Sequence, residues 1–140
     1  MVKPAEPGIY NEFIRGLELV TISLEKLKVD FPGASAPDVG QLEISLDDKK
    51  TKEVLPDNNV KILHRHIIVI KPVGKDDVYF KFDSTFAVLY QTASEMSLAI
   101  WEVFKNRNIY MITWPYLREL FQSTLYRFNL PPLTLPARKT

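Results

Sequence analysis

Cysteine is absent from the 140 residues of this chain. Disulfides, thiolate zinc sites and a cysteine nucleophile are therefore excluded, and the absence is compatible with a reducing compartment. The sequence also lacks an apolar run of the roughly 18 residues that a transmembrane helix needs, and its first residues have no signal-peptide pattern. We therefore expect a cytoplasmic protein that does not insert into a membrane.

An excess of charge of one sign is also missing, because the net charge is +1. This balance gives no electrostatic reason to expect nucleic acid or an anionic membrane as a partner. The five glycines are too scattered to form a phosphate loop or a dinucleotide fingerprint, and no nucleophile elbow is present. We expect neither an enzyme nor a bound cofactor.

The residues that are present indicate one folded domain spanning 1–140. Hydrophobic residues make up 46% of the chain, and no internal repeat, low-complexity tract or linker divides it. Four segments have strand character and are joined by short connections, which favours an antiparallel sheet. The segments are Leu19–Phe31, Gln41–Lys52, Val60–Lys71 and Val78–Gln91. Helical segments follow, so the predicted fold class is α+β with helices packed on one face of the sheet.

The first predicted strand changes the parity of its apolar residues part-way along. Val20, Ile22 and Leu24 alternate in one parity, whereas Leu27 and Val29 alternate in the other. Side chains alternate between the two faces of a strand, so these sets would lie on opposite faces. We therefore predict a bulge or bend at Glu25–Lys26 that turns the second half of the strand.

Three helical segments are predicted in addition to the strands. A short helical turn is expected within Gly8–Leu19, capped by Asn11 and ended by Gly16. A second helix would begin with a capping box from Thr92 to Glu95. The main helix is expected to start near Thr113, with Pro115 in its first turn. It carries a single apolar stripe of Trp114, Leu117, Leu120, Phe121, Thr124, Leu125 and Phe128.

The sheet contains more apolar surface than one helix can cover, since the third and fourth strands are apolar on both faces. This surplus must meet another copy of the chain or a client. The fourth strand also carries an aromatic stripe, and we favour its packing as core beneath the helix over its use as a groove for clients. The stripe consists of Phe80, Phe82, Phe86 and Tyr90.

His64 and His66 form an H-x-H pair that places both rings on one face of a strand. This spacing suits metal ligands. The alternative is a pair of histidines at a strand surface or subunit contact, and we favour it because no cysteine or Glu/His cluster supports a metal. The nearby run Asp47–Lys50 is expected to be a solvated strand end rather than a catalytic group.

Two short stretches near the end of the chain resemble the SecB family of export chaperones. They are WPYLRE, residues 114–119, and NLPPLTL, residues 129–135. The LPPLTL form is most similar to SecB-like chaperones found beside toxin–antitoxin pairs. The matched positions, which we interpret as structural, are Trp114, Pro115, Tyr116, Arg118, Glu119, Leu130, Pro131 and Leu133.

The resemblance implies a homotetramer, a dimer of dimers, that holds unfolded or nascent polypeptides in apolar grooves without ATP. Preproteins or an antitoxin would be the clients. Docking on the translocase motor is doubtful, because export members tend to be acidic and the net charge here is +1. The alternative is an oligomeric binding protein of the same fold that serves one specific partner or ligand.

We expect the client groove on the first two strands, because the crossing loop 32–40 lies between them. The residues predicted to line the groove are Leu19, Ile22, Leu24, Leu42, Ile44 and Leu46.

Overall fold

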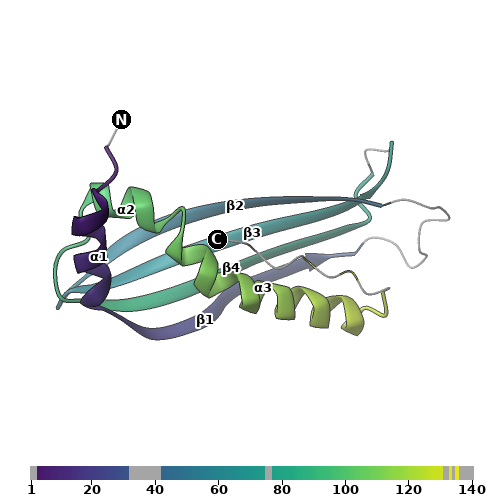
Figure 1. Cartoon of the computed structure of the whole chain (residues 1–140). Coiled ribbons are helices and arrows are strands. Elements are labelled where there is room, and N and C mark those ends of the chain that lie inside the picture. The colour runs from purple at the N-terminus through teal and green to yellow at the C-terminus, as the bar shows by residue number, and fades with distance from the viewer. Residues whose placement is uncertain (1–2, 32–41, 75–76, 131–132, 134, 136–140) are drawn as a thin grey trace.

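The predicted α+β architecture is confirmed. The computed structural model describes residues 3–31, 42–74, 77–130, 133 and 135, and within them three helices accompany one four-stranded antiparallel sheet (Figure 1). The elements follow the order α1 (Pro7–Arg15), β1 (Leu17–Asp30), β2 (Leu42–Leu55), β3 (Asn59–Pro72), β4 (Phe80–Thr92), α2 (Leu98–Phe104) and α3 (Asn108–Arg127). The predicted crossing loop 32–40 lies outside the described residues.

The strands are arranged in the order β1-β4-β3-β2, so β1 and β2 are the two outer strands. β2 and β3 pair in one register from Leu42–Pro72 to Leu55–Asn59. The turn between them contains Asp57 and Asn58, which have φ values of 63° and 60°. Asn and Asp tolerate this left-handed region better than most residues. The long hairpin therefore has a turn suited to its sequence.

β1 contains two register shifts against β4, and one of them is the predicted bulge. This shift lies between Leu24 and Lys26, with Glu25 as the extra residue. It pairs Leu24 with Phe86 and Leu27 with Ser84, so both leucines lie on the helix-bearing face of the sheet. The other shift lies between Leu19 and Thr21 and was not predicted. Together the two bulges keep Leu19, Ile22, Leu24, Leu27 and Val29 on one face, whereas Val20 is the extra residue of the first shift.

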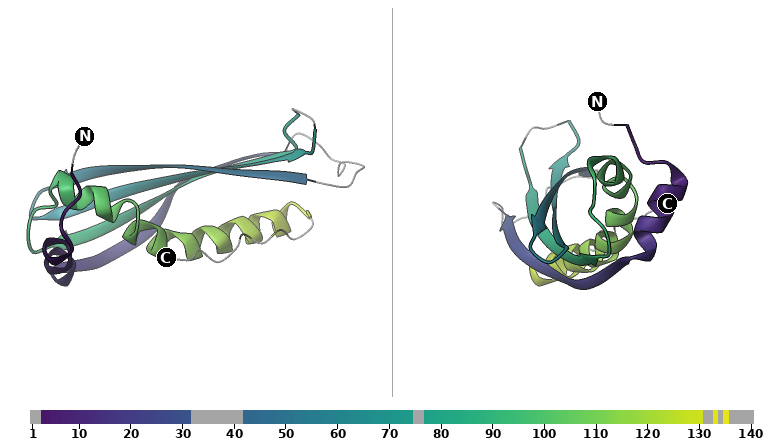
Figure 2. Two further views of the ribbon diagram at one scale, coloured as in Figure 1. Left: turned by 45° about the horizontal axis from the view of Figure 1, so that its top comes forward. Right: turned by 90° about the vertical axis from the view of Figure 1, so that its left-hand side faces the viewer.

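All three helices lie on the same side of the sheet, with α1 and α2 at one end and α3 along the rest (Figure 2). The apolar residues beneath them form two clusters. One joins α1 and α2 to the nearer ends of β3 and β4, and the other joins α3 to the far ends of the same strands. The aromatic stripe Phe80, Phe82, Phe86 and Tyr90 is buried, which confirms that it is core.

The helix ends differ from the predictions. α3 begins at Asn108 rather than near Thr113, because Ile109 is already fully buried and extends the apolar stripe backwards. Pro115 consequently lies inside the helix and not in its first turn. Gly16 ends α1 as predicted.

The two predicted N-terminal caps are wrong. α1 begins at Pro7, which leaves Asn11 inside the helix. The capping box at Thr92–Glu95 does not form, because Thr92 still belongs to β4 and Ser97 caps α2 by accepting from the Ile100 amide at 3.2 Å.

Candidate functional site

The six predicted groove residues all lie on the helix-bearing face, but they divide into two sets at opposite edges of the sheet. Leu19, Ile22 and Leu24 are on β1, and Leu42, Ile44 and Leu46 are on β2. The inner strands β4 and β3 lie between the two sets (Figure 1). One groove within a single subunit therefore cannot contain all six residues side by side. Whether either set binds a client stays a prediction.

Four of these six side chains are accessible in the single chain. Leu19, Leu24 and Ile44 are each 43% exposed and Leu46 is 40% exposed, whereas Ile22 and Leu42 are half-buried against the core. Two further exposed apolar residues on the same face were missed, Leu27 on β1 and Val54 on β2. The alternation of side chains along each strand would have identified both residues, if the bulge in β1 and the full length of β2 had been known. Each outer strand thus presents exposed apolar side chains on the helix-bearing face of the sheet.

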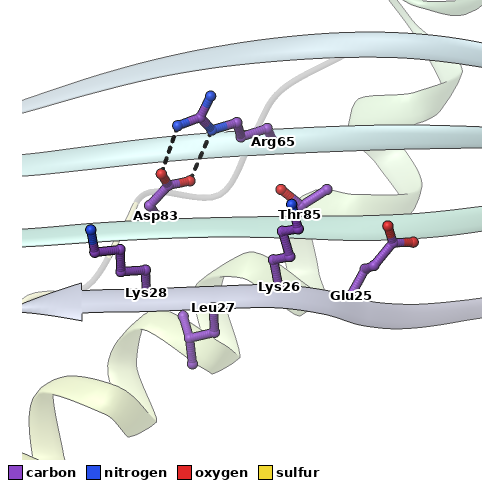
Figure 3. A pocket seen from close by; sticks show the side chains of 7 residues that line it. All are labelled: Glu25, Lys26, Leu27, Lys28, Arg65, Asp83 and Thr85. Carbon is purple, nitrogen blue, oxygen red and sulfur yellow. Dashed lines mark hydrogen bonds and ion pairs between the residues drawn. The ribbon is translucent and has the colours of Figure 1, made fainter.

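The opposite face of the sheet carries no helix among the described residues and has a mixed surface. Arg65 on β3 and Asp83 on β4 form a double hydrogen bond of 3.0 and 2.7 Å. This contact with Arg65 lowers the pKa of Asp83 below its ordinary value. Glu25, Lys26, Lys28 and Thr85 line a hollow of about 610 Å³ together with the pair (Figure 3). The hollow combines both signs of charge and contains no nucleophile–base arrangement.

His64 and His66 share one face as predicted, but they do not lie at a strand surface. Both are 0% exposed and sit on β3 between the two apolar clusters, beneath α3. His64 Nε2 lies 2.8 Å from Asp48 Oδ2, and His64 Nδ1 lies 2.7 Å from Thr113 Oγ1. Asp48 comes from β2, where it is the register partner of His66. Among the described residues, Asp48, His64 and His66 form a group that could hold a metal ion, with ligand atoms within 4.8 Å of one another.

Asp48 was expected in a solvated charge run, but it takes part in a polar network. Burial would raise the pKa of Asp48, yet hydrogen bonds from Tyr110 and His64, with the charge of Lys50, lower the pKa below its ordinary value. Lys50 Nζ also donates to the Tyr110 hydroxyl at 2.7 Å. Asp47, the neighbouring residue, is exposed and pairs with Ile67 in the register of the two strands. The network therefore connects β2 and β3 to α3.

No protein-family model matches the sequence, and no curated protein matches it. Among solved structures, it is similar to the SecB-like chaperone Rv1957 of Mycobacterium tuberculosis, solved in complex with a ChAD peptide from the HigA1 antitoxin. The TM-score is 0.80 at 19% identity, over 91% of this chain and 94% of that one. The chain has the SecB-like fold. A protein of unknown function from Streptococcus agalactiae matches with a TM-score of 0.42 at 12% identity, over 86% of this chain and 97% of that one.

Within the SecB-like fold, the residues of the WPYLRE stretch divide between core and surface. Trp114 is buried against the α3 side of the sheet, and Arg118 is half-buried. Pro115, Tyr116 and Glu119 are exposed on α3. Trp114 and Arg118 therefore have structural contacts within the chain. The exposed Tyr116 also lies near the core, with its ring centroid 6.3 Å from that of Phe86, whereas Pro115 and Glu119 lie on an accessible helix surface.

The proline-leucine stretch begins with a turn that ends the long helix of the SecB-like fold. Asn129 has a φ of 58°, and the Leu130 amide donates to the Leu125 carbonyl at 3.0 Å. This pattern satisfies a carbonyl at the end of α3. Leu133 is half-buried and Leu135 is buried in the second apolar cluster. Pro131 lies outside the described residues.

No helix among residues 3–31, 42–74 and 77–130 is long and apolar enough to cross a membrane.

Proposed function

We propose that this protein is an ATP-independent holding chaperone that binds unfolded or nascent polypeptides, including an antitoxin or a preprotein, along its apolar sheet edges. The observation that carries the proposal is the row of exposed apolar side chains at each outer strand. Leu24 on β1 and Leu46 on β2 are representative, because both lie on the helix-bearing face next to the free side of an edge strand in the described sheet. An edge strand offers unpaired backbone groups and a row of apolar side chains. An extended client can pair with both, because it has backbone hydrogen-bonding groups and alternate apolar side chains of its own.

The assembly proposed for this activity is a cytoplasmic homotetramer. The two apolar sets lie at opposite edges of one subunit, so assembly of several copies is one way to bring edges together and to cover the surplus apolar surface. Support for a polypeptide client comes from the similar SecB-like chaperone of M. tuberculosis, which is bound to a peptide from an antitoxin. Delivery to the translocase motor is not included, because export members of the family tend to be acidic and the net charge of this chain is +1.

The first test is suppression of aggregation. A chemically unfolded model protein is diluted into buffer without nucleotide, with and without the chaperone, and light scattering is followed. We expect suppression at a near-stoichiometric amount of tetramer and no binding to the folded model protein. Light scattering after size-exclusion chromatography measures the oligomeric state in the same samples.

The structure supplies matched variants for this test. Leu24→Glu and Leu46→Glu place charge on the proposed client surface, and we expect each to reduce suppression. Ser23→Glu and Ser45→Glu are the controls, since both serines are exposed neighbours on the opposite face of the same strands. If all four variants suppress as well as the unchanged chain, the apolar edges are not the client surface.

The alternative is a binding protein of the same fold that serves one specific partner. It predicts no suppression for unrelated unfolded proteins, but saturable binding of one polypeptide or ligand. Absence of suppression by the unchanged chain would therefore overturn the general holding activity and favour the dedicated partner.

A further inference from the structure

The two histidines of the chain meet a carboxylate at the boundary between its two apolar clusters. We propose that Asp48, His64 and His66 form a binding site for one divalent transition-metal ion of the zinc class. The ion would join β2 to β3 beneath α3. The inference does not rest on client binding, because it is argued from the three ligand groups and their own contacts; of these, Asp48 lies two residues from Leu46 on the same face of β2.

The ligand atoms already lie close to the positions that such an ion needs. His64 and His66 are two residues apart on β3, which directs both rings to one face, with ring centroids 3.9 Å apart. Asp48 reaches the same face from β2, and the three ligand atoms lie within 4.8 Å of one another. Tetrahedral coordination at typical Zn–N and Zn–O lengths separates ligand atoms by about 3.3 Å. The 2.8 Å contact between His64 Nε2 and Asp48 Oδ2 would therefore open by about half an ångström.

The donor set is chemically suited to zinc. Imidazole and carboxylate groups bind Zn²⁺ in sites with three protein ligands, and the fourth position is then taken by water or another oxygen. His64 and His66 are both fully buried, so neighbouring side chains rather than solvent surround their rings. Asp48 lies on an outer strand with its side chain 25% exposed. An ion can therefore approach from the edge of the sheet.

The polar contacts behind the three ligands orient them for this role. Thr113 Oγ1 donates to the Ile109 carbonyl at 2.8 Å, so it accepts a hydrogen bond from Nδ1 of His64. This assignment directs Nε2 of the ring toward Asp48. Histidines that bind metals are commonly fixed by such a hydrogen bond from the other ring nitrogen. The Tyr110 hydroxyl donates to Asp48 Oδ2 and supports the carboxylate in the same way.

The close contact of Nε2 with a carboxylate oxygen is compatible with a metal ion between the two groups. If Nδ1 carries the hydrogen that faces Thr113, then neutral His64 would present a lone pair to Asp48, because a neutral imidazole has only one N–H. A proton on Nε2 satisfies the contact, and a metal ion that replaces this proton satisfies it too.

Lys50 is the group that opposes metal binding. Its Nζ lies 3.5 Å from Asp48 Oδ2 and donates to the Tyr110 hydroxyl. The positive charge of Lys50 this close to Asp48 would repel a divalent cation bound to the same carboxylate. Removal of the charge by Lys50→Met should therefore tighten binding of the ion. This expected gain distinguishes the proposed site from adventitious binding elsewhere on the surface.

The test uses the full chain with every affinity tag removed and Zn²⁺ as the probe. Calorimetric titration should show one ion per chain. We expect His64→Gln, His66→Gln and Asp48→Asn each to weaken binding at least about a hundredfold, since loss of a supporting residue alone typically costs 10–100-fold. Lys50→Met should tighten it about tenfold. Asp47→Asn is the matched control, because Asp47 lies on the opposite face of β2, and it should leave binding unchanged.

A second measurement on the unchanged chain covers the case in which a histidine variant does not fold. The chain has only two histidines, so ¹⁵N-edited spectra of the imidazole groups report the site directly. Both sets of ring signals should move when one equivalent of Zn²⁺ is added, and Nε2 of His64 should change most. Unchanged ring signals, absence of binding, or affinity that is the same in the Asp48→Asn and Lys50→Met variants would each overturn the proposal.

Discussion

Arg118 Nε donates a hydrogen bond to the backbone carbonyl of Leu135 at 2.8 Å. This contact connects the two stretches on which the SecB resemblance depends, since Arg118 belongs to WPYLRE and Leu135 ends NLPPLTL. The side chain of Leu135 packs at the same time into the cluster beneath α3. The helix and the segment after it therefore stabilise each other, which supports the structural interpretation of Arg118.

Arg118→Met should loosen this attachment while keeping much of the apolar side-chain stem. A hydrogen bond from a charged group to a partly buried carbonyl typically contributes about 1.5–3 kcal/mol, so we expect a loss of roughly this size in the free energy of unfolding. Urea denaturation measures the loss, and hydrogen exchange near residue 135 reports its location. Arg127→Met is the control, because Arg127 is exposed in the last turn of α3. Equal stability of the two variants would show that the contact contributes little.

Gly16 and Gly8 should respond in opposite ways to alanine. A Cβ atom at Gly16 would lie 2.6 Å from the Cβ of Ala93, whereas a Cβ atom at Gly8 would have no neighbour within 4 Å. Gly16→Ala should therefore destabilise the chain by about 1–3 kcal/mol. Gly8→Ala lies in α1 and should be neutral or stabilising by up to about 1 kcal/mol. Thermal unfolding compares the two, and similar midpoints would contradict the close approach at Gly16.

The pair of Arg65 and Asp83 should make stability depend on pH. The pKa of Asp83 is lowered in the folded chain by its contact with Arg65. The contribution of the ion pair is therefore present above the ordinary carboxyl pKa of about 4 and is lost as the pH falls through the lower folded value. Asp83→Asn should flatten this part of the curve of unfolding midpoint against pH between 2 and 6. Arg65→Gln should flatten it to the same extent, and added salt should weaken the effect. Parallel curves for all three proteins would exclude the pair as a source of the dependence.

The strands could be predicted from the sequence because a single physical rule determines them. Ile22 and Leu24 on β1 alternate in one parity, Leu27 and Val29 alternate in the other, and a bulge at Glu25 is a local way to keep both sets on one face. The shift between Leu19 and Thr21 was not predicted. The start of α3 was placed too late because Pro115 was read as a first-turn residue. Proline is tolerated inside this helix, where it remains exposed.

The candidate sites required information that is not local in the sequence. The two sets of groove residues were expected together, but strand order places β1 and β2 at opposite edges, and neither periodicity nor composition determines that order. Asp48 was similarly read as solvated because its neighbours Asp47 and Lys49 are charged. Its burial depends on the register that sets it against His66 and beneath α3.

The extra residue at Glu25 also affects how the surface of β1 can change during evolution. Residues 26–30 alternate lysine or aspartate with leucine or valine. Loss of one residue at the bulge would exchange the two sets, so that charged groups would face α3 and apolar groups the outer surface. An insertion or deletion at this point therefore has more effect on the character of the edge than most substitutions. Among descendants of this chain, we expect the length of β1 to be preserved more strictly than the identity of its residues.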